Sequence, residues 1–451
     1  MSAQRSPFLT TYIAIAVLAA LSGYLYFFDR EHDPNAEERV FAHLDLDAIR
    51  AVTLSRADGE TIRLERETGE EWRLVSPSAL PADAATVRTL LSATERLTLD
   101  QVVEGGTDRI ADFGLVAPRF TLSLEAEGGT ETLRLELGNE APGGEAVYAR
   151  ESGRADVLAV ASSIATDFDK HAFDFRDRDV LHIERDAIDR LEISGPEGGF
   201  ALAKTSEDED AWVFTRPLST PAGRWSVDGL VGLLAGLRMD AVAAEEADDL
   251  AAFGLDVPLR RIVIGLGAEQ KILEIGSSPG EGQYHAREAS SRLVAVIPGT
   301  LVDDLAGGMD ALRATRLLEV STFEVTGFTA QLAAERRSYT SQPGEGDDGA
   351  KRWTRSEPEP AELESTPVED LLYDLGGLQV EAFVDTPGPD AQYGLDAPAA
   401  TIRLTRRENS ELEVVLGIAG ESAWARRPGD DAILRLNAEK VGSLLEKLAG
   451  L

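Results

Sequence analysis

The stretch FGLVAP, from Phe113 to Pro118, recurs twice along the chain, as FGLDVP from Phe253 to Pro258 and as YGLDAP from Tyr393 to Pro398. Successive copies begin 140 residues apart. A constant interval between similar stretches indicates that one unit has been copied in tandem. The chain of 451 residues is long enough for about three domains of ordinary size. The motif therefore predicts three tandem copies of one domain.

Several further features occur in the same order in each copy. They include an apolar segment with helical spacing, an LG dipeptide at the end of a predicted strand, and a following ARE or ARR. Any one of these features would be weak alone, but their shared order indicates triplication. We place the three repeat units at 41–175, 176–315 and 316–451. The repeated positions are Trp72, Trp212 and Trp353; Val87, Val227 and Val368; Gly138, Gly276 and Gly417; and Arg150, Arg287 and Arg426.

Each unit has the pattern of an antiparallel sheet with helices. In the first unit, AVTLSR and TIRLERE alternate apolar and polar residues around the turn ADGE, and RFTLSLEAE and ETLRLELG alternate around GG. Such alternation is typical of strands with one buried face, and the glycine pair is a strong hairpin signal. A helix is expected between these groups and a short helix at the end. The predicted fold class is α+β, with an N-terminal transmembrane helix followed by three tandem repeat domains of mostly antiparallel sheet with helices.

The repeated motif residues are expected to be structural. Glycine permits a positive φ that other residues resist, and proline fixes φ just before the next strand. The aromatic residue and the leucine of each motif, and each repeated tryptophan, are expected to lie in a core. A functional role would need polar groups at the motif, and only Asp256 and Asp396 occur there. The residues assigned this structural role are Trp72, Trp212, Trp353, Phe113, Gly114, Leu115, Pro118, Phe253, Gly254, Leu255, Pro258, Tyr393, Gly394, Leu395 and Pro398.

The N-terminal segment 8–28, FLTTYIAIAVLAALSGYLYFF, contains no charged residue and is long enough to cross a bilayer as a helix. A cleaved signal peptide is the alternative, with small residues near Ala19 and Ser22, but the apolar run exceeds a usual signal core. The sequence thus predicts a single-pass anchor at 8–28, a short cytoplasmic tail at 1–7 and a linker at 29–40. The expected location is the bacterial inner membrane, with the bilayer contacted through 8–28 and the C-terminal bulk in the periplasm or outside.

The overall charge and the cysteine count exclude some classes of function. The net charge is −36 and there is no cysteine. Such an acidic surface repels phosphate backbones, so no nucleic-acid partner is expected. The lack of cysteine excludes disulfides, thiolate catalysis and cysteine-ligated metals. The acidity is most simply a matter of solubility, and a specific basic partner is the alternative.

No motif for catalysis or cofactor binding is found in the sequence. It contains no HExxH and no GxxxxGKS or GxxxxGKT, which are signatures of zinc proteases and P-loop enzymes. The stretch GSSPG, at 276–280, has the GxSxG spacing of serine hydrolases, but it begins a glycine-bearing turn, SSPGEGQ, and is not interpreted as a nucleophile site. The acidic run DFDKHAFDFRDRD, at 167–179, lacks the central glycine and closing glutamate of a calcium-binding loop. We therefore predict no enzyme activity, no cofactor and no metal site.

Arg150, Arg287 and Arg426 are the candidate binding residues, because an arginine occupies the same position in each unit. They would form a ligand patch only if the three units bring them together. The simpler interpretation is that each arginine pairs with acidic side chains nearby, at the end of a strand.

Together these features resemble the bacterial domain of unknown function 4340 family. The resemblance rests on the N-terminal anchor, the tryptophan, the FGLxxP or YGLxxP motif, the LG dipeptide and an FR junction, and covers nearly all the chain after the anchor. Proteins similar to this are often encoded beside an ABC-type exporter and a gliding-motility-like auxiliary protein. The family brings no catalytic residues. The third copy departs from the pattern at its start, where EVSTFEV replaces HLDLDAI.

The resemblance implies a non-catalytic, membrane-anchored, extracytoplasmic scaffold or binding subunit, accessory to an ABC-type export or gliding-like envelope complex. Its expected partners are an ABC-type permease or an auxiliary subunit. Two alternatives stay open. One is a carboxylate-dependent envelope hydrolase, since glycoside cleavage needs only two carboxylates. The other is a binding protein for a cationic ligand, which rests on the net charge alone.

Overall fold

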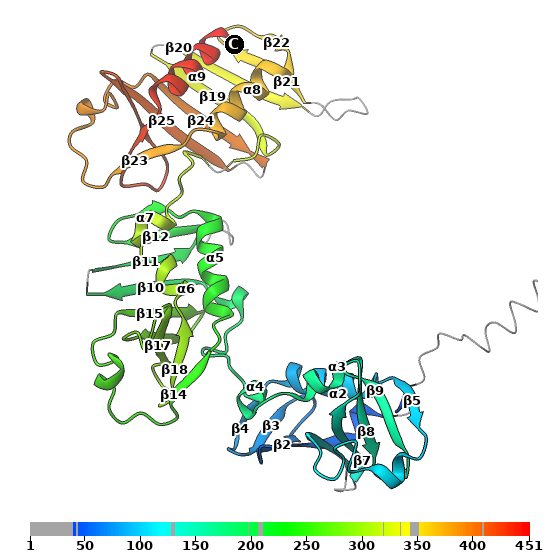
Figure 1. The fold of residues 1–451 in the computed structure, drawn as a ribbon. Helices are drawn as coiled ribbons and strands as arrows, with labels where there is room; N and C mark the ends of the chain where they lie inside the picture. The colour runs from blue at the N-terminus through cyan, green and yellow to red at the C-terminus, as the bar shows by residue number, and fades with distance from the viewer. Residues whose placement is uncertain are drawn as a thin grey trace, which may run out of the picture. The chain divides into compact units, whose positions relative to one another are not determined.

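The computed structural model describes residues 39–41, 44–127, 131–196, 198–205, 211–318, 320–333, 335–342, 351–407 and 410–451. The chain divides into two compact units, Met1–Arg178 and Asp179–Leu451. The first unit contains one nine-stranded sheet and the second contains two (Figure 1).

The first sheet consists of β1 (Ile49–Arg56), β2 (Thr61–Arg66), β3 (Trp72–Ser76), β4 (Leu80–Ala82), β5 (Leu99–Val103), β6 (Phe120–Ala126), β7 (Glu131–Glu140), β8 (Ala146–Glu151) and β9 (Val157–Ala161). Its helices are α2 (Ala84–Glu95), α3 (Ser163–Phe168) and α4 (Ala172–Phe175), with 3-10 turns η1 (Leu46–Ala48) and η2 (Gly106–Arg109). The strand order is β4-β3-β2-β1-β6-β7-β8-β9-β5. Each neighbouring pair is antiparallel.

The second sheet has the same order, as β13-β12-β11-β10-β15-β16-β17-β18-β14. Its strands are β10 (Arg190–Gly195), β11 (Gly198–Lys204), β12 (Trp212–Arg216), β13 (Thr220–Pro221), β14 (Ala241–Ala244), β15 (Arg260–Leu266), β16 (Glu269–Ile275), β17 (Gln283–Glu288) and β18 (Val294–Pro298). The helices and turns are η3 (Arg185–Ala187), α5 (Arg224–Ala235), η4 (Ala251–Phe253), α6 (Thr300–Asp304) and α7 (Gly308–Leu312).

The third sheet repeats the order once more, as β22-β21-β20-β19-β24-β25-β26-β27-β23. Its strands are β19 (Val325–Leu332), β20 (Glu335–Gln342), β21 (Arg352–Glu357), β22 (Ala361–Leu363), β23 (Val380–Val384), β24 (Ala400–Arg406), β25 (Glu411–Ala419), β26 (Ser422–Arg426) and β27 (Ile433–Leu436). The helices and turn are α8 (Ser365–Gly376), η5 (Asp390–Gln392) and α9 (Ala438–Gly450). Three copies of one strand order confirm the predicted tandem repeats.

One face of each sheet is covered by helices, as α8 and α9 cover the third sheet in Figure 1. The alternation of residue types decides which face. In β1, Val52 and Leu54 are fully buried, while Thr53 between them is only partly buried, because successive strand residues point to opposite faces. Leu90 on α2 and Ile164 on α3 belong to the same buried cluster as the two strand residues. Each repeat is therefore a sheet layer with a helix layer on one side.

The long helix of each repeat has the spacing that the sequence predicts. Helix α2 begins where Asp83 accepts hydrogen bonds from the backbone N–H groups of Ala85 and Thr86 at 2.9 and 3.2 Å, as an N-cap residue does. Buried residues then recur every three to four positions, so one stripe of the helix faces the sheet. These residues are Val87, Leu90, Leu91 and Thr94 in α2; Val227, Leu230, Val231 and Leu234 in α5; and Val368, Leu371, Leu372 and Leu375 in α8.

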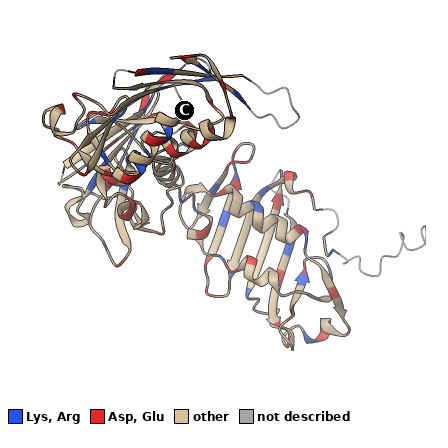
Figure 2. Cartoon of the chain, turned by 90° about the horizontal axis from the view of Figure 1, so that it is seen from above, with Lys and Arg blue, Asp and Glu red and all other residues tan. Residues whose placement is uncertain are grey.

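The opposite face of the first sheet carries polar side chains. Arg63 donates to both carboxylate oxygens of Glu125 at 2.8 and 3.1 Å and to the hydroxyl of Thr53 at 3.2 Å. The hydrogen bonds from Arg63 lower the pKa of Glu125. Basic and acidic residues alternate with other residues along the strands (Figure 2), as is common in an antiparallel sheet with one face toward water.

The predicted fold class, α+β with an N-terminal transmembrane helix, is wrong. The described chain is mostly antiparallel sheet, in three nine-stranded sheets with few helices. Within the described ranges, no helix has both the length and the apolar character needed to cross a membrane. Residues 8–28, where the anchor was predicted, lie outside the residues that the structure describes.

Short edge strands explain much of the excess of sheet over the expectation. β4 and β5 close the two edges of the first sheet, and β5 is mainly exposed, without the alternation that marks a half-buried strand. They pair with β3 and β9, and because they are short, little unpaired backbone is left at the edges of the sheet. Their residues show no alternation of apolar and polar side chains, so the local sequence pattern does not predict them.

Isolated backbone bridges hold the chain where it leaves a sheet. Ala82 pairs with Arg176 in the first unit, and Ala222 pairs with Arg313 at the equivalent place in the second. The strands of the three sheets fall within 41–175, 176–315 and 316–451. The residue limits themselves stay predictions.

Candidate functional site

The motif glycines adopt backbone conformations that favour glycine. Gly114, Gly254 and Gly394 have φ values of 71°, 66° and 67°, in the left-handed region that other residues resist. Space is restricted as well, since a Cβ at Gly114 would lie 2.5 Å from Asn139 Oδ1 and one at Gly394 would collide with the carbonyl oxygen of Ile418. These positions therefore shape the chain and leave no room for a side chain.

The glycine of each LG dipeptide lies against the motif loop of its own repeat. At this glycine a Cβ would collide with the backbone carbonyl oxygen of the motif aromatic residue. The pairs are Gly138 with Phe113, Gly276 with Phe253, and Gly417 with Tyr393. The sequence analysis treated the two motifs separately, but the structure brings them into one joint. Their constant separation in all three copies was the signal that could have linked them.

The residue before ARE or ARR packs against the ring of the motif aromatic residue. The ring centroids are 4.5 Å apart for Phe113 and Tyr148, 5.1 Å for Phe253 and His285, and 5.0 Å for Tyr393 and Trp424. Separations of this size are typical of aromatic pairs in cores. Because tyrosine and tryptophan fill the same position in the other repeats, the ring of His285 has a packing role.

The remaining motif residues are placed as follows. Leu115, Leu255 and Leu395 are buried, and so are Trp72, Trp212 and Trp353. Pro118, Pro258 and Pro398 stand two residues before β6, β15 and β24. Asp256 and Asp396, the polar residues of the motif, are exposed. Phe113 and Tyr393 are buried, whereas Phe253, which was also expected to lie in a core, is only partly buried. The structural role assigned to the motif residues stays a prediction.

The three candidate binding arginines each pair with a carboxylate in their own repeat. Arg150 reaches Glu136 at 2.5 Å, and Arg287 reaches Glu274 at 2.8 Å, in both cases across neighbouring strands. In the third repeat the strand neighbour of Arg426 is Val415. Arg426 instead donates to both carboxylate oxygens of Asp390, on η5, at 3.1 and 2.7 Å. The guanidinium groups are thus occupied locally, and a binding role for them stays a prediction.

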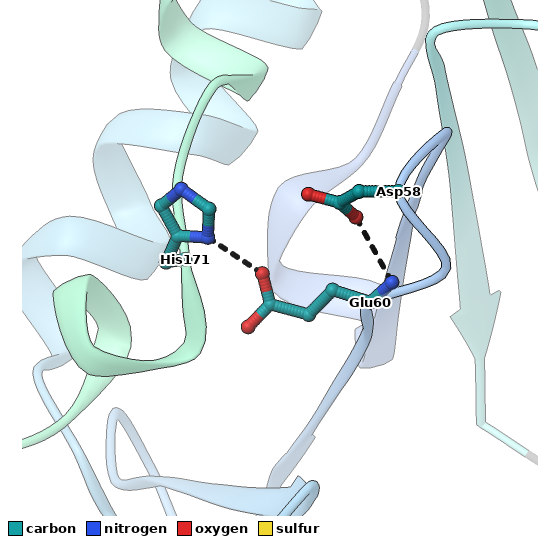
Figure 3. A group of neighbouring side chains, drawn as sticks. All are labelled: Asp58, Glu60 and His171. Atoms are coloured by element: carbon teal, nitrogen blue, oxygen red, sulfur yellow. Dashed lines mark hydrogen bonds and ion pairs between the residues drawn. The ribbon is translucent and has the colours of Figure 1, made fainter.

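A second candidate is the side-chain cluster of Asp58, Glu60 and His171 (Figure 3). Asp58 and Glu60 lie in the turn between β1 and β2, and His171 precedes α4. Their oxygen and nitrogen atoms lie within 4.8 Å of one another, and His171 Nδ1 is 2.7 Å from Glu60 Oε2. Carboxylates and imidazole at this separation are a set that can ligate a metal ion. The cluster therefore has to be tested against its surroundings.

The surroundings of this cluster already satisfy its carboxylates. Asp58 accepts from the backbone N–H of Glu60 at 3.0 Å and from Arg56 Nε at 3.3 Å. These two interactions lower the pKa of Asp58. The second oxygen of Glu60 accepts from the backbone N–H of Ala172 at 3.1 Å, and Arg56 also pairs with Asp169 at 2.8 Å. The guanidinium of Arg56 already supplies the positive charge that a metal ion would bring. The cluster therefore links the β1–β2 turn to the start of α4, and this fits the geometry better than a metal centre does.

The repeated sequence matches one known protein family. The sequence matches the family described as a domain of unknown function (DUF4340) at residues 72–211, 212–398 and 353–451. This chain belongs to the DUF4340 family. Each DUF4340 match begins at the repeated tryptophan of one unit, Trp72, Trp212 or Trp353, and the second and third matches overlap at 353–398. The first of them begins at residue 72, so the DUF4340 assignment does not extend to the predicted membrane anchor.

Among solved structures, the DUF4340 chain is matched at a low level to two crystal structures of a DNA polymerase sliding clamp from Pseudomonas aeruginosa, one of them with a ligand. Both are 7% identical to it, with TM-scores of 0.16. The matches cover 88% and 87% of this chain and 93% and 91% of the clamp chains. TM-scores this low carry no argument about fold or function. No curated protein matches the chain.

Proposed function

We propose that this DUF4340 chain is a non-catalytic scaffold or binding subunit, accessory to an ABC-type export or gliding-like envelope complex. The observation that supports the proposal is that one architecture occurs three times, and that the repeated residues pack or form ion pairs within their own repeat. The motif aromatic residue contacts a ring in every repeat, and the repeated arginines pair locally. Tandem domains of this kind provide several similar surfaces in one chain.

The open faces of the sheets are the surfaces that a partner would contact. On the second sheet, Glu274 lies between Arg261 and Arg287, at 3.9 and 2.8 Å. On the third, Arg403 lies between Glu411 and Glu413, at 3.7 and 2.5 Å. Such interleaved charges are only partly buried and so are weakly stabilising, but they fix the orientation of a polar partner and disfavour wrong ones.

The hydrolase alternative is not favoured by the carboxylate pair in the first repeat. A glycosidase needs a carboxylic acid whose pKa is raised, so that it is protonated near neutral pH. The pKa of Asp58 is lowered instead, by the hydrogen bond from Glu60 N–H and by Arg56. The alternative of a cationic ligand still rests on net charge alone.

A pull-down under mild conditions tests the proposal. The tagged full-length chain is recovered from its native cells and the co-purifying proteins are identified by mass spectrometry. We expect an ABC-type permease or its auxiliary subunit in near-stoichiometric yield. The control is the same chain with the open face of the third sheet altered by Arg403→Glu, which should lower the yield of a partner bound there. Recovery of the chain alone, in every mild detergent tested, would contradict the proposal.

A further inference from the structure

A buried arginine connects the second repeat to the third inside the second compact unit. Arg313, which follows α7, donates to Asp385 Oδ1 at 2.8 Å, and its side chain is only 1% exposed. Its guanidinium lies 4.5 Å from the centre of the Phe383 ring, and it also pairs with Asp310 at 3.2 Å. Phe383 and Asp385 lie at the end of the edge strand β23. An acidic and an apolar side chain of the third repeat thus bind an arginine from outside that repeat.

A second contact shows that this end of the third repeat is a docking surface. The backbone N–H of Ser219 donates to Asp431 Oδ2 at 2.8 Å, and the backbone N–H of Asp431 donates to the carbonyl oxygen of Ser219 at 2.8 Å. Ser219 lies between β12 and β13, and Asp431 lies between β26 and β27. Because β27 pairs with β23, the turn before β27 and the end of β23 belong to neighbouring strands, and both receive the second repeat.

The first repeat has the same position at the end of β5, the edge strand that corresponds to β23 (Figure 1). Val102 pairs with Leu158, and Phe383 pairs with Leu434. The two leucines hold one register, since each lies opposite the alanine that precedes the repeated arginine of its sheet. Val102 therefore stands at the place of Phe383.

The acidic residue of this position occurs in every copy. The residue directly after the edge strand is Glu104 in the first repeat, Glu245 in the second and Asp385 in the third. In the first repeat an apolar side chain and a carboxylate are therefore placed as they are where the third repeat binds Arg313.

The two positions differ in what covers them. Phe383 is only partly exposed, and the guanidinium of Arg313 lies over its ring. Val102 is 46% exposed, and Glu104 is exposed as well. No hydrogen bond or ion pair of the Glu104 side chain is found within the described ranges. The first repeat thus shows the acid and the apolar residue without a cation on them in the described chain.

The sequence does not place an arginine where the second repeat has one. The backbone N–H of Val40 donates to the carbonyl oxygen of Leu97 at 2.8 Å, and that of Leu317 donates to Leu378 at 2.9 Å, so these two entry segments correspond. Arg313 stands four residues before Leu317, and the residue four before Val40 is alanine. A guanidinium at the first position therefore has to come from another part of the chain or from another molecule.

The surroundings of this position favour a cation. Asp100 on β5 and Asp156 before β9 are both exposed, and the net charge of the chain is −36. Acidic surface of this kind attracts basic partners and disfavours acidic ones. Arginines close by in the sequence are already paired, Arg109 with Asp112 at 2.8 Å and Arg154 with Glu151 at 3.5 Å.

We propose that Val102 and Glu104 form a binding position for an arginine side chain of a partner protein. A carboxylate accepts paired N–H groups from a planar guanidinium, while the apolar side chain lies against the carbon stem of the arginine. Lysine is less suited, because its ammonium is compact and strongly hydrated. The position lies at a sheet edge, outside the open faces assigned to a partner above. It goes beyond the scaffold function, because it specifies a side chain that any partner bound there must present.

A peptide titration of the full chain tests the proposal without the partner complex. The probe is a peptide of residues 308–314, GMDALRA, with blocked ends, because this segment presents Arg313 to the third repeat. Methyl NMR of Val102 follows the binding. We expect a saturable shift with a dissociation constant in the millimolar range, and about fivefold weaker binding when the peptide carries Arg313→Gln. No shift of Val102 at about 10 mM peptide would overturn the proposal, whether the position binds nothing or is already filled by residues 1–38.

A matched pair of chain variants locates the binding. We expect Glu104→Gln to weaken the peptide about fivefold, and the control Asp100→Asn, which removes one charge from the same edge strand, to stay within about twofold. On the Glu104→Gln chain, the arginine and glutamine peptides should bind about equally, because both changes remove the same pair. Equal weakening by the two chain variants would overturn the proposal, since it would reflect net charge alone. Circular dichroism of both variants checks that the fold is kept.

Discussion

The first and third sheets place different residues at the same register positions. In the first sheet Val52 pairs with Leu64 and Leu124. At the equivalent place in the third, Phe328 pairs with Tyr339 and Leu404. The rings of Phe328 and Tyr339 stack at 4.3 Å, and the ring of Trp353 meets Phe328 edge-on at 5.9 Å. The third sheet thus builds with aromatic rings what the first builds with aliphatic chains.

The added volume is offset at the next inward position along the strands. Leu54 in the first sheet pairs with Ile62 and Leu122, whereas Ala330 in the third pairs with Arg337 and Ile402. A small residue thus accompanies the large rings, as close-packed interiors require. The comparison teaches that the backbone register is the constant part of this repeat, while side-chain volume is redistributed within it.

Arg337, which stands at the position of Ile62, makes contacts that Ile62 cannot make. Arg337 donates to the carbonyl oxygens of Leu448 and Ala449, both at 2.9 Å. These groups belong to the last turn of α9, where carbonyls have no partner within the helix. The third repeat has the single helix α9 at the place where the first has the two short helices α3 and α4.

The largest expected loss of stability comes from replacing Arg427 of the third repeat by the glutamate that the other two repeats have at this position. Arg427 occupies the position of Glu151 and Glu288, and its pairing with Asp430 is buried. Arg427→Glu leaves Asp430 buried without its cation, and we expect a loss of about 3–5 kcal/mol in the stability of the third repeat. Hydrogen exchange of peptides from β26 and β27, in the full chain, measures this locally.

The reciprocal change is the control for that prediction. Glu288→Arg alters a half-buried side chain of the second sheet, and we expect an effect within about 0.5 kcal/mol. If both changes cost the same, the buried pair in the third repeat does not have the importance that its burial implies.

A transplant of the aromatic pair has the next largest effect. Val52→Phe with Leu64→Tyr adds volume to a filled core, and we expect the first sheet to lose about 1–3 kcal/mol. Adding Leu54→Ala, as in the third sheet, should recover part of that loss. Hydrogen exchange of β1 and β2 measures both variants. If the triple variant is no more stable than the double variant, the small residue does not compensate for the added ring volume.

A smaller effect is expected from removing the strand partner of a repeated arginine. Glu136→Val gives the first sheet the valine that the third has at Val415. Because Arg150 is partly exposed, we expect a loss of about 0.2–1 kcal/mol, measured by urea unfolding of the full chain. Glu274→Val should behave alike in the second sheet. A cost of several kcal/mol in either sheet would mean that the pair is more than a surface ion pair.

The smallest effect concerns the titration of Asp390. The hydrogen bond from Arg426 and its charge lower the pKa of Asp390 in the folded chain. A lowered pKa means that the stabilisation is present above the ordinary carboxyl pKa, and is lost as the pH falls through the folded value. We expect Arg426→Gln to return the pKa of Asp390 to its ordinary range, as followed by carboxyl-carbon NMR. An unchanged pKa would show that Arg426 does not hold this carboxylate in solution.

The repeat itself could be predicted because its signals are local or periodic. The motif glycines, the buried tryptophans and the helical stripe that begins at Val87 all follow from residue type and spacing. The edge strands β4 and β5 could not be predicted, since they form to complete the ladders of neighbouring strands. The predicted fold class was wrong because helices are few beside three nine-stranded sheets, and the edge strands add to that difference.

The sites depend on contacts that sequence spacing does not reveal. Glu60 and His171 are 111 residues apart in the chain. In a sequence with 80 acidic residues, no particular pair of carboxylates stands out. Only the folded chain shows that Arg56 already neutralises one cluster.

The sequence by itself determined that one sheet unit is repeated three times and which residues face its core, because burial follows the alternation of apolar and polar side chains. The tertiary structure decided which charges are paired and which are not. Ion pairs form between strands and turns that meet only after folding, and their partners differ even between copies, as Arg150 and Arg426 illustrate.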